Sequence, residues 1–253
     1  MERLPALAAD LVRLNVDAIL TGTNPSTVAA RQTITTIPIV MAAGNDPVGA
    51  GLVASLARPG GNITGVTADT GDEIYGKRLE LLKNVVSRLS RVAVLWNPDF
   101  APNQSRWKVI TDAALKLGLQ LLSKEARSSD DLESAFDAMV KERANALLVL
   151  VDPVLFNYRG QIGTLATKHR LPAISDVREY AVAGLLLTYG VDLPGLWRRA
   201  AGYADRILKG AKPSDLPIEQ PTKFELVSNG KTAKALGVAI PQSVLLGVDE
   251  VIQ

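Results

Sequence analysis

The sequence predicts an α/β protein whose sheets are parallel and whose chain forms two lobes. Short apolar runs alternate with amphipathic helical stretches, and this alternation is typical of βαβ units with right-handed crossovers. Most of the runs are continuously apolar, as in strands that are buried on both faces. The two lobes are inferred from a weak internal repeat, because Asn24-Pro25 and Asp152-Pro153 each follow an apolar run and open a helix. Convergence of two ordinary strand–loop–helix units is the alternative explanation.

The expected strands leave room for a helix or a loop between them. In chain order they are 16–20, 37–42, 63–66, 92–96, 119–122, 146–151, 172–175, 185–188 and 224–227. We expect a helix at 4–14, a helix rich in small residues at 49–56, and a long helix at 196–208. The long helix has apolar side chains spaced to pack on the sheet of the first lobe, whereas the strand at 224–227 is expected in the second lobe.

The composition is that of a globular protein and excludes several classes of function. Of the 253 residues, 47% are hydrophobic and 21% are charged. The net charge of +2 is spread along the chain, so nucleic acid is not expected as a partner. No apolar run approaches the length of a membrane-spanning helix, which is about 20 residues. No signal peptide is visible after Met1.

The sequence offers little for catalysis, so we expect a binding protein without catalytic residues, metal ligands or cofactors. The absence of cysteine excludes thiolate nucleophiles and zinc–cysteine sites. The single histidine, His169, lies at the end of an expected helix, where a positive group suits the helix dipole. Without a second histidine, His-based metal sites and Ser-His pairs have little support. No glycine-rich dinucleotide-binding motif follows any expected strand.

Polar side chains gather where the expected strands end, and ligands bind at these ends in open parallel sheets. In the first lobe they are Thr23, Asn24, Ser26, Asp46 and Thr67, and in the second lobe Asn97, Asn103, Asp152 and Asp176. Helix N-termini favour an anion and isolated carboxylates favour an ammonium group, so we expect a small zwitterionic or acidic ligand. Asp152 and Asp46 are the preferred partners of an ammonium group, because an unpaired carboxylate in a closing cleft is costly. Ordinary helix capping is an equal alternative for the residues at helix starts.

Several motifs resemble those of a known family over nearly the whole chain. In chain order they are residues 35–40 (TTIPIV), 46–48 (DPV), 51–56 (GLVASL), 58–66 (RPGGNITGV), 77–83 (KRLELLK), 92–98 (VAVLWNP), 201–210 and 231–237 (KTAKALG). On these motifs the chain resembles the substrate-binding proteins of bacterial ABC transporters, in the family related to tryptophan- and other aromatic amino acid-binding lipoproteins.

This resemblance implies a type I periplasmic-binding fold, in which two Rossmann-like lobes joined by a hinge close on a small ligand. We expect one lobe to comprise 1–67 and 190–217, and the other 68–189 and 218–253. The implied partner is an ABC transporter permease in the membrane. The implied location is the periplasm, or a lipid-anchored extracytoplasmic position, if a signal precedes Met1. Similar proteins have an export signal and one more βαβ unit before the helix that begins this chain, so we expect the chain to be truncated at its N-terminus.

Two other classes of function stay open at this point. The first is an enzyme on a doubly wound scaffold, although no nucleophile–base pair stands out in the sequence. The second is a ligand-sensing effector module, as in transcription regulators that use the same two-lobed fold. The sequence does not choose the ligand, although the resemblance suggests an aromatic amino acid.

Overall fold

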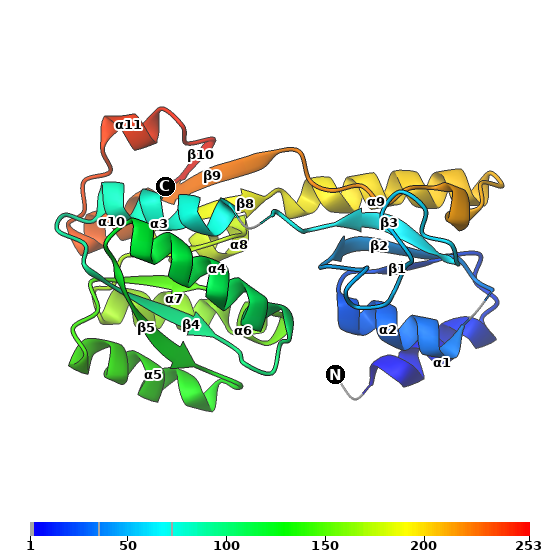
Figure 1. Cartoon of the computed structure of the whole chain (residues 1–253), viewed down its shortest axis with the longest axis horizontal. Helices are drawn as coiled ribbons and strands as arrows, with labels where there is room; N and C mark the ends of the chain where they lie inside the picture. The colour runs from blue at the N-terminus through cyan, green and yellow to red at the C-terminus, as the bar shows by residue number, and fades with distance from the viewer. Residues whose placement is uncertain (1–2, 35, 72) are drawn as a thin grey trace. The chain divides into compact units, whose positions relative to one another are not determined.

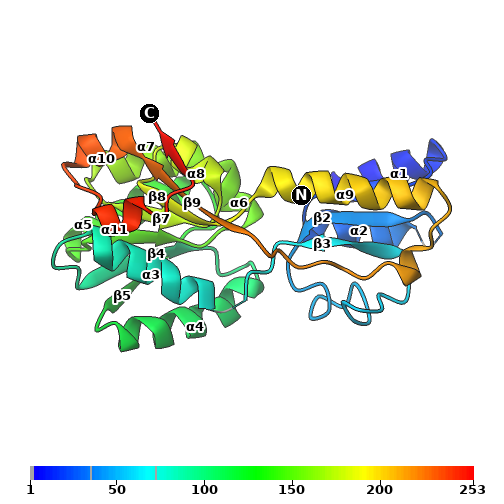
Figure 2. The same ribbon diagram turned by 90° about the horizontal axis from the view of Figure 1, so that it is seen from above.

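The computed structural model describes residues 3–34, 36–71 and 73–253, which form two compact units. Unit 1 comprises Met1–Thr70 and Asp192–Lys223, and unit 2 comprises Gly71–Val191 and Phe224–Gln253. The chain therefore passes from one unit to the other three times. Each unit has a sheet of its own with helices on both faces (Figures 1 and 2).

The sheet of unit 1 is parallel throughout. Within the described residues its strands are, in spatial order, β1 (Ile19–Thr21), β2 (Ile39–Gly44) and β3 (Ile63–Thr67). On one face lie α2 (Asn24–Thr33), which joins β1 to β2, and α1 (Leu4–Arg13), which packs against α2 (Figure 1). The stripe expected along α1 is only partly covered, because Ala8 is buried whereas Leu7 and Leu14 are exposed.

The opposite face of this sheet is covered by α9 (Leu193–Leu208), the long helix expected from the sequence (Figure 1). Its buried side chains are Leu196, Ala200, Tyr203 and Ile207. They recur every three or four residues and therefore form one helical face. The Tyr203 hydroxyl donates a hydrogen bond to the Pro217 carbonyl at 2.6 Å, and this bond fixes the segment that follows the short 3-10 helix η1 (Pro213–Asp215).

The helix expected at 49–56 is not formed, so this prediction is wrong. Residues 47–50 form turns instead, and the amide N–H groups of Leu52 and Val53 both donate to the Pro47 carbonyl. The backbone φ angles of Asp46 and Gly51 are +39° and +65°, in the left-handed region that a right-handed helix does not contain. The glycines of this segment also have low helix propensity.

The sheet of unit 2 runs in the spatial order β10-β9-β8-β7-β6-β4-β5 within the described residues. Its strands are β4 (Arg91–Trp96), β5 (Gln120–Glu125), β6 (Ala146–Val149), β7 (Ala173–Ser175), β8 (Leu187–Val191), β9 (Phe224–Asn229) and β10 (Glu250–Ile252). All neighbouring pairs are parallel except β8 and β9. The chain leaves unit 2 after Val191 and returns at Phe224, which is paired with Val191, so β9 has to run back along β8.

Helices cover both faces of this sheet (Figures 1 and 2). One face carries α3 (Glu73–Val85), α4 (Pro102–Lys116) and α11 (Gln242–Leu245). The other face carries α5 (Asp130–Lys141), α6 (Pro153–Asn157), α7 (Arg159–Lys168), α8 (Arg178–Val182) and α10 (Gly230–Leu236). Fully buried side chains such as Leu79, Val94 and Leu148 form the core beneath α3. Every strand expected from the sequence is present with shifted ends, whereas β10 was not expected.

Candidate ligand-binding site

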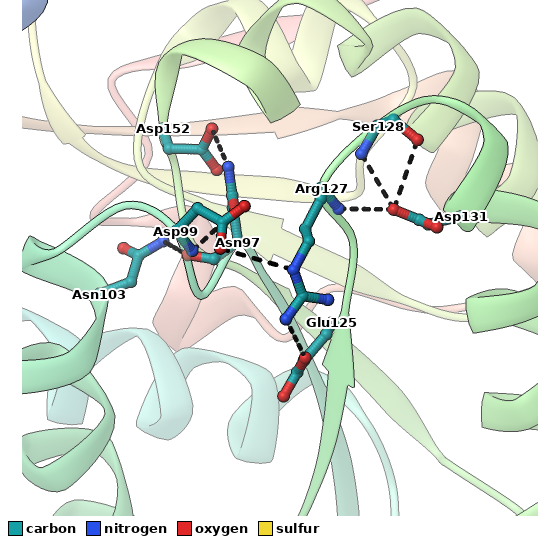
Figure 3. Close-up of polar contacts among 8 residues, drawn as sticks. All are labelled: Asn97, Asp99, Asn103, Glu125, Arg127, Ser128, Asp131 and Asp152. Carbon is teal, nitrogen blue, oxygen red and sulfur yellow. Dashed lines mark hydrogen bonds and ion pairs between the residues drawn. The ribbon is translucent and has the colours of Figure 1, made fainter.

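Neighbouring strands of unit 2 end in polar residues that the sequence predicted as ligand groups. Asn97 directly follows β4, Asp152 follows β6 after two residues, and Asp176 directly follows β7. The strands lie in the order β7-β6-β4 and are parallel, so their carboxyl ends share one edge of the sheet. Asn97, Asp152 and Asn103 are brought together there, as Figure 3 shows.

The two asparagines hold the loop after β4 in place. Asn97 is 5% exposed and Asn103 is fully buried. The Asn97 side chain accepts a hydrogen bond from the Asp99 amide at 3.0 Å, and the Asn103 amide group donates to the Asn97 carbonyl at 3.2 Å. Arg106 of α4 donates to the Asn103 side chain at 3.1 Å and to the Val151 carbonyl at 3.2 Å. The loops after β4 and β6 are therefore tied together through Arg106.

One oxygen of the Asp152 carboxylate accepts hydrogen bonds, whereas the other has no hydrogen-bond partner among the described residues. Oδ1 accepts hydrogen bonds from the amides of Val154 at 2.7 Å and Leu155 at 3.2 Å, and so caps α6. Asn97 Nδ2 lies 3.5 Å from the same oxygen. Oδ2 is buried and has no hydrogen-bond partner among the described residues. Burial raises the pKa of Asp152, and the two backbone hydrogen bonds oppose this rise.

Asp176 presents a second buried oxygen. Oδ1 has no hydrogen-bond partner within the part of the chain that the structure describes. Burial raises the pKa of Asp176, and the positive charges of Arg78 and Arg106 oppose this rise. Desolvation therefore dominates over the nearby positive charges.

Tyr180 of α8 adds an unpartnered hydroxyl to the two carboxylates. Its side chain is fully buried, and its hydroxyl forms no hydrogen bond with any described residue. Burial raises the pKa of Tyr180 well above 10.0, and the negative charges of Asp176 and Asp152 raise it further. Both carboxylates are thus close enough to Tyr180 to act on it electrostatically. The Tyr180 ring meets Phe156 edge to face, with ring centroids 6.1 Å apart.

The polar residues predicted in unit 1 form local hydrogen bonds. Thr23 and Ser26 bond each other at the start of α2, and Asn24 accepts a hydrogen bond from the Asn45 amide at 2.8 Å. The Asp46 carboxylate accepts from the Gly49 amide at 2.9 Å, and the buried Thr67 hydroxyl accepts from the Asp69 amide at 3.2 Å. These bonds are the ordinary capping and turn contacts that the sequence left as an alternative. A ligand contact for these residues stays a prediction.

Three residues that contact or act on the polar groups of unit 2 were not predicted from the sequence: Arg78, Arg106 and Tyr180. Arg78 gave a usable signal, because it lies one helical turn from both Ile74 and Leu82 in the buried stripe of α3. A charged residue in such a stripe requires a buried partner. Arg106 and Tyr180 gave no comparable signal.

Arg127, which follows β5, forms ion pairs with Glu125 and Asp99 at 2.9 and 3.5 Å, and its side chain is half exposed (Figure 3).

The described residues contain no group of three or more His, Asp or Glu side chains that could hold a metal ion. His169 ends α7 as expected, and its ring stacks on Phe136 with centroids 5.9 Å apart. Of the helices that the structure describes, none is long and apolar enough to cross a membrane. The site is therefore a set of acidic and hydroxyl groups at strand ends, with arginines nearby.

Comparison with known proteins identifies relatives over almost the whole chain. The "Tyrosine-binding protein" of Clostridioides difficile (strain R20291) is 28% identical over 237 residues, which are 93% of this chain and 67% of that protein. A conserved domain protein from Vibrio cholerae o1 biovar eltor is 28% identical with a TM-score of 0.87, over 98% of this chain and 83% of that one.

An ABC domain in complex with L-Trp from Streptococcus pneumonia has a TM-score of 0.88 at 24% identity, over 99% of this chain and 84% of that one. At this identity the likeness shows the fold, and it confirms the expected type I periplasmic-binding fold. The profile of the family described as "ABC transporter substrate binding protein" matches residues 1–252. The chain belongs to the family of ABC transporter substrate-binding proteins.

Proposed function

We propose that this protein is the solute-binding component of an ABC importer and that its ligand is an amino acid, with the ligand ammonium group held in unit 2. The observation that carries this proposal is the set of buried oxygens on Asp152, Asp176 and Tyr180 that have no hydrogen-bond partner among the described residues. A buried carboxylate oxygen without a hydrogen bond costs free energy, and a cationic donor removes that cost. An ammonium group has three N–H donors and no acceptor, which matches a site made of acceptor oxygens.

An aromatic side chain is the favoured class of ligand. One relative is named as a tyrosine-binding protein, and a protein of the same fold was crystallised with L-Trp. We propose that Asn97 and Asn103 shape the site from the loop after β4. We propose for Thr23, Asn24, Ser26, Asp46 and Thr67 a ligand-facing position in unit 1, as the sequence predicts.

Membership of the family supports the remaining parts of the proposal. The protein is not an enzyme, and it delivers its ligand to an ABC permease on the extracytoplasmic side of the membrane. We propose that the two units act as the two lobes of a binding protein, with the three chain crossings as the hinge; their bounds lie within a few residues of the bounds 1–67 and 190–217, and 68–189 and 218–253, that the sequence predicts. Ligand binding shifts the population of the protein between open and closed states.

Calorimetric titration of the purified protein with L-tyrosine, L-tryptophan, L-leucine and L-glutamate tests the proposal. At one hundred times the dissociation constant, a ligand stabilises the folded protein by about 2.7 kcal/mol, so melting temperatures give an independent readout. Asp176→Asn removes the negative charge and replaces one of the two acceptor oxygens by an NH2 donor, and it is expected to abolish binding. Asp112→Asn changes an exposed residue of α4 and is the matched control. The absence of binding across all four ligands, or unchanged affinity in Asp176→Asn, would refute the proposal.

A further inference from the structure

Arg78 is a fully enclosed charge that no part of the proposed binding mechanism has used. It lies on α3, is 2% exposed, and is the largest of the fully buried side chains. Burial lowers the pKa of Arg78, and Asp176 is the first of the groups that oppose this effect. Its guanidinium carbon also lies 5.1 Å from the centre of the Tyr75 ring. A charge this deeply enclosed destabilises the fold unless it has partners.

The contacts of Arg78 lead directly to the backbone of Asp176. Arg78 Nε donates a hydrogen bond to the Tyr189 carbonyl at 2.8 Å, and this carbonyl belongs to the peptide bond between Tyr189 and Gly190. The next residue, Gly190, touches the peptide of Asp176 so closely that an added Cβ would lie 1.9 Å from the Asp176 carbonyl oxygen. Arg78 therefore holds the stretch of β8 against which the backbone of Asp176 rests.

Arg78 also acts on the charge of Asp176. The positive charge of Arg78 is the main effect that opposes the burial of this carboxylate. The other charged or titratable groups that act on Asp176 or on Tyr180 beside it are Arg106 on α4, Asp152 after β6 and Arg159 on α7. Arg106 is held by Asn103 of α4 and by the Val151 carbonyl after β6, whereas Arg78 is held by β8.

We propose that Arg78 is a positioning residue of the ligand site, which fixes the Asp176 backbone through β8 and keeps the Asp176 carboxylate negatively charged for a cationic ligand group. This proposal rests on the proposed function only for the identity of the ligand group. In the absence of Arg78, Asp176 takes up a proton at a higher pH and no longer attracts an ammonium group. Arg78 does not need to touch the ligand to have this effect.

The test is the titration of the Asp176 carboxyl group by carbon-13 NMR in the ligand-free protein, with its signal assigned through Asp176→Asn. Arg78→Met removes both the charge and the hydrogen bond, Arg78→Gln keeps a donor for the Tyr189 carbonyl, and Arg78→Lys keeps the charge. Lys77→Met changes an exposed neighbour on the same helix and is the matched control. We expect the Asp176 midpoint to rise in the Met and Gln variants, to stay near the wild-type value in the Lys variant, and not to move in the control.

Amino acid affinity at neutral pH provides a second readout. We expect a loss of about tenfold in Arg78→Gln, because a protonated Asp176 no longer gives the ligand ammonium group a hydrogen bond to a charged partner. If Arg78→Met does not fold, Arg78→Gln carries the test. A folded, uncharged variant with an unchanged Asp176 midpoint would overturn the inference and leave the proposed function standing. A shifted midpoint in a protein that binds no amino acid would refute the proposed function and leave the inference standing.

Discussion

Replacing Gly190 by alanine tests whether the end of β8 is as tightly fitted to the Asp176 backbone as the structure shows. A Cβ at Gly190 lies 1.9 Å from the carbonyl oxygen of Asp176 and 2.7 Å from its carbonyl carbon. Real Cβ contacts essentially never fall below 3.0 Å, so β8 and the Asp176 peptide have to separate by the difference between 3.0 and 1.9 Å. Both groups are backbone, so no side chain can rotate away to relieve the contact.

The size of the effect follows from what this separation disturbs. Residues 174–175 of β7 pair with residues 187–188 of β8 directly beside the contact. Overpacking by one methyl group costs about 1–3 kcal/mol, and strained backbone pairing adds to it. We therefore expect Gly190→Ala to lower the unfolding free energy of unit 2 by about 3 kcal/mol. The same shift moves Asp176, so amino acid affinity should fall as well.

Tryptophan fluorescence during unfolding in guanidinium chloride measures this loss in unit 2. Trp96 and Trp107 belong to unit 2, whereas Trp197 belongs to unit 1, so a Trp197→Phe background leaves only the signal of unit 2. Gly160→Ala is the matched control, because Gly160 lies in α7 and no atom beyond its chain neighbours and its own helix backbone lies within 4 Å of the added Cβ. It should raise stability by up to about 1 kcal/mol. An unfolding midpoint of Gly190→Ala equal to that of the parent would refute the close fit.

Three further predictions concern individual side chains. Asp152→Asn should keep the cap on α6, because the Asn oxygen can accept the same two amide hydrogen bonds, yet lose amino acid binding; circular dichroism and calorimetry check the two halves of this expectation. Burial raises the pKa of Asp152 above 3.8, so the protonated form favours folding. This contribution to the unfolding free energy is full below pH 3.8 and is lost as the pH rises through the raised pKa. Asp152→Asn should therefore flatten the pH dependence of the unfolding free energy, measured by denaturant unfolding at a series of pH values. The hydrogen bond from Arg178 lowers the pKa of Glu250 below 4.5, so this ion pair should stabilise β10 above pH 4.5 and lose its effect as the pH falls through the lowered pKa. Both side chains are 39% exposed, so Glu250→Gln should cost less than about 1 kcal/mol. Amide hydrogen exchange in β10 measures this loss.

The fold was largely predictable because its signals are local. Continuous apolar runs such as 92–96 and 146–151 are too short for a typical helix and therefore favour buried strands, and the helices between them follow from periodicity. The failures have physical reasons. The segment 49–56 has small, apolar residues, but Gly51 within it adopts a left-handed conformation that a right-handed helix does not contain. The strand β10 has only three residues, too few for a recognisable pattern, and it pairs with β9 at the edge of the sheet.

The candidate site was predictable only at the level of topology. Asn97, Asp152 and Asp176 were found because each follows a strand, and parallel strands bring their ends together. The sequence could not show that one oxygen of Asp152 caps a helix while the other has no partner among the described residues. Nor could it place Tyr180, which comes from a helix after β7 and joins the carboxylates only through folding. Arg78 acts through a carbonyl 111 residues further along the chain.

The buried acceptor oxygens of Asp152, Asp176 and Tyr180 lower the stability of the fold. A buried acceptor without a hydrogen bond costs about 1–3 kcal/mol, and apolar residues of similar shape would remove that cost. The structure holds such acceptors on Asp152, Asp176 and Tyr180, and it leaves them at the edge of the sheet where parallel strands present their ends. Arg78 and Arg106 limit the electrostatic part of the cost without donating to Asp176 Oδ1. On the proposed function, a cationic donor group of the ligand would remove this cost, and the stability lost in the free protein would then add to the affinity for the ligand.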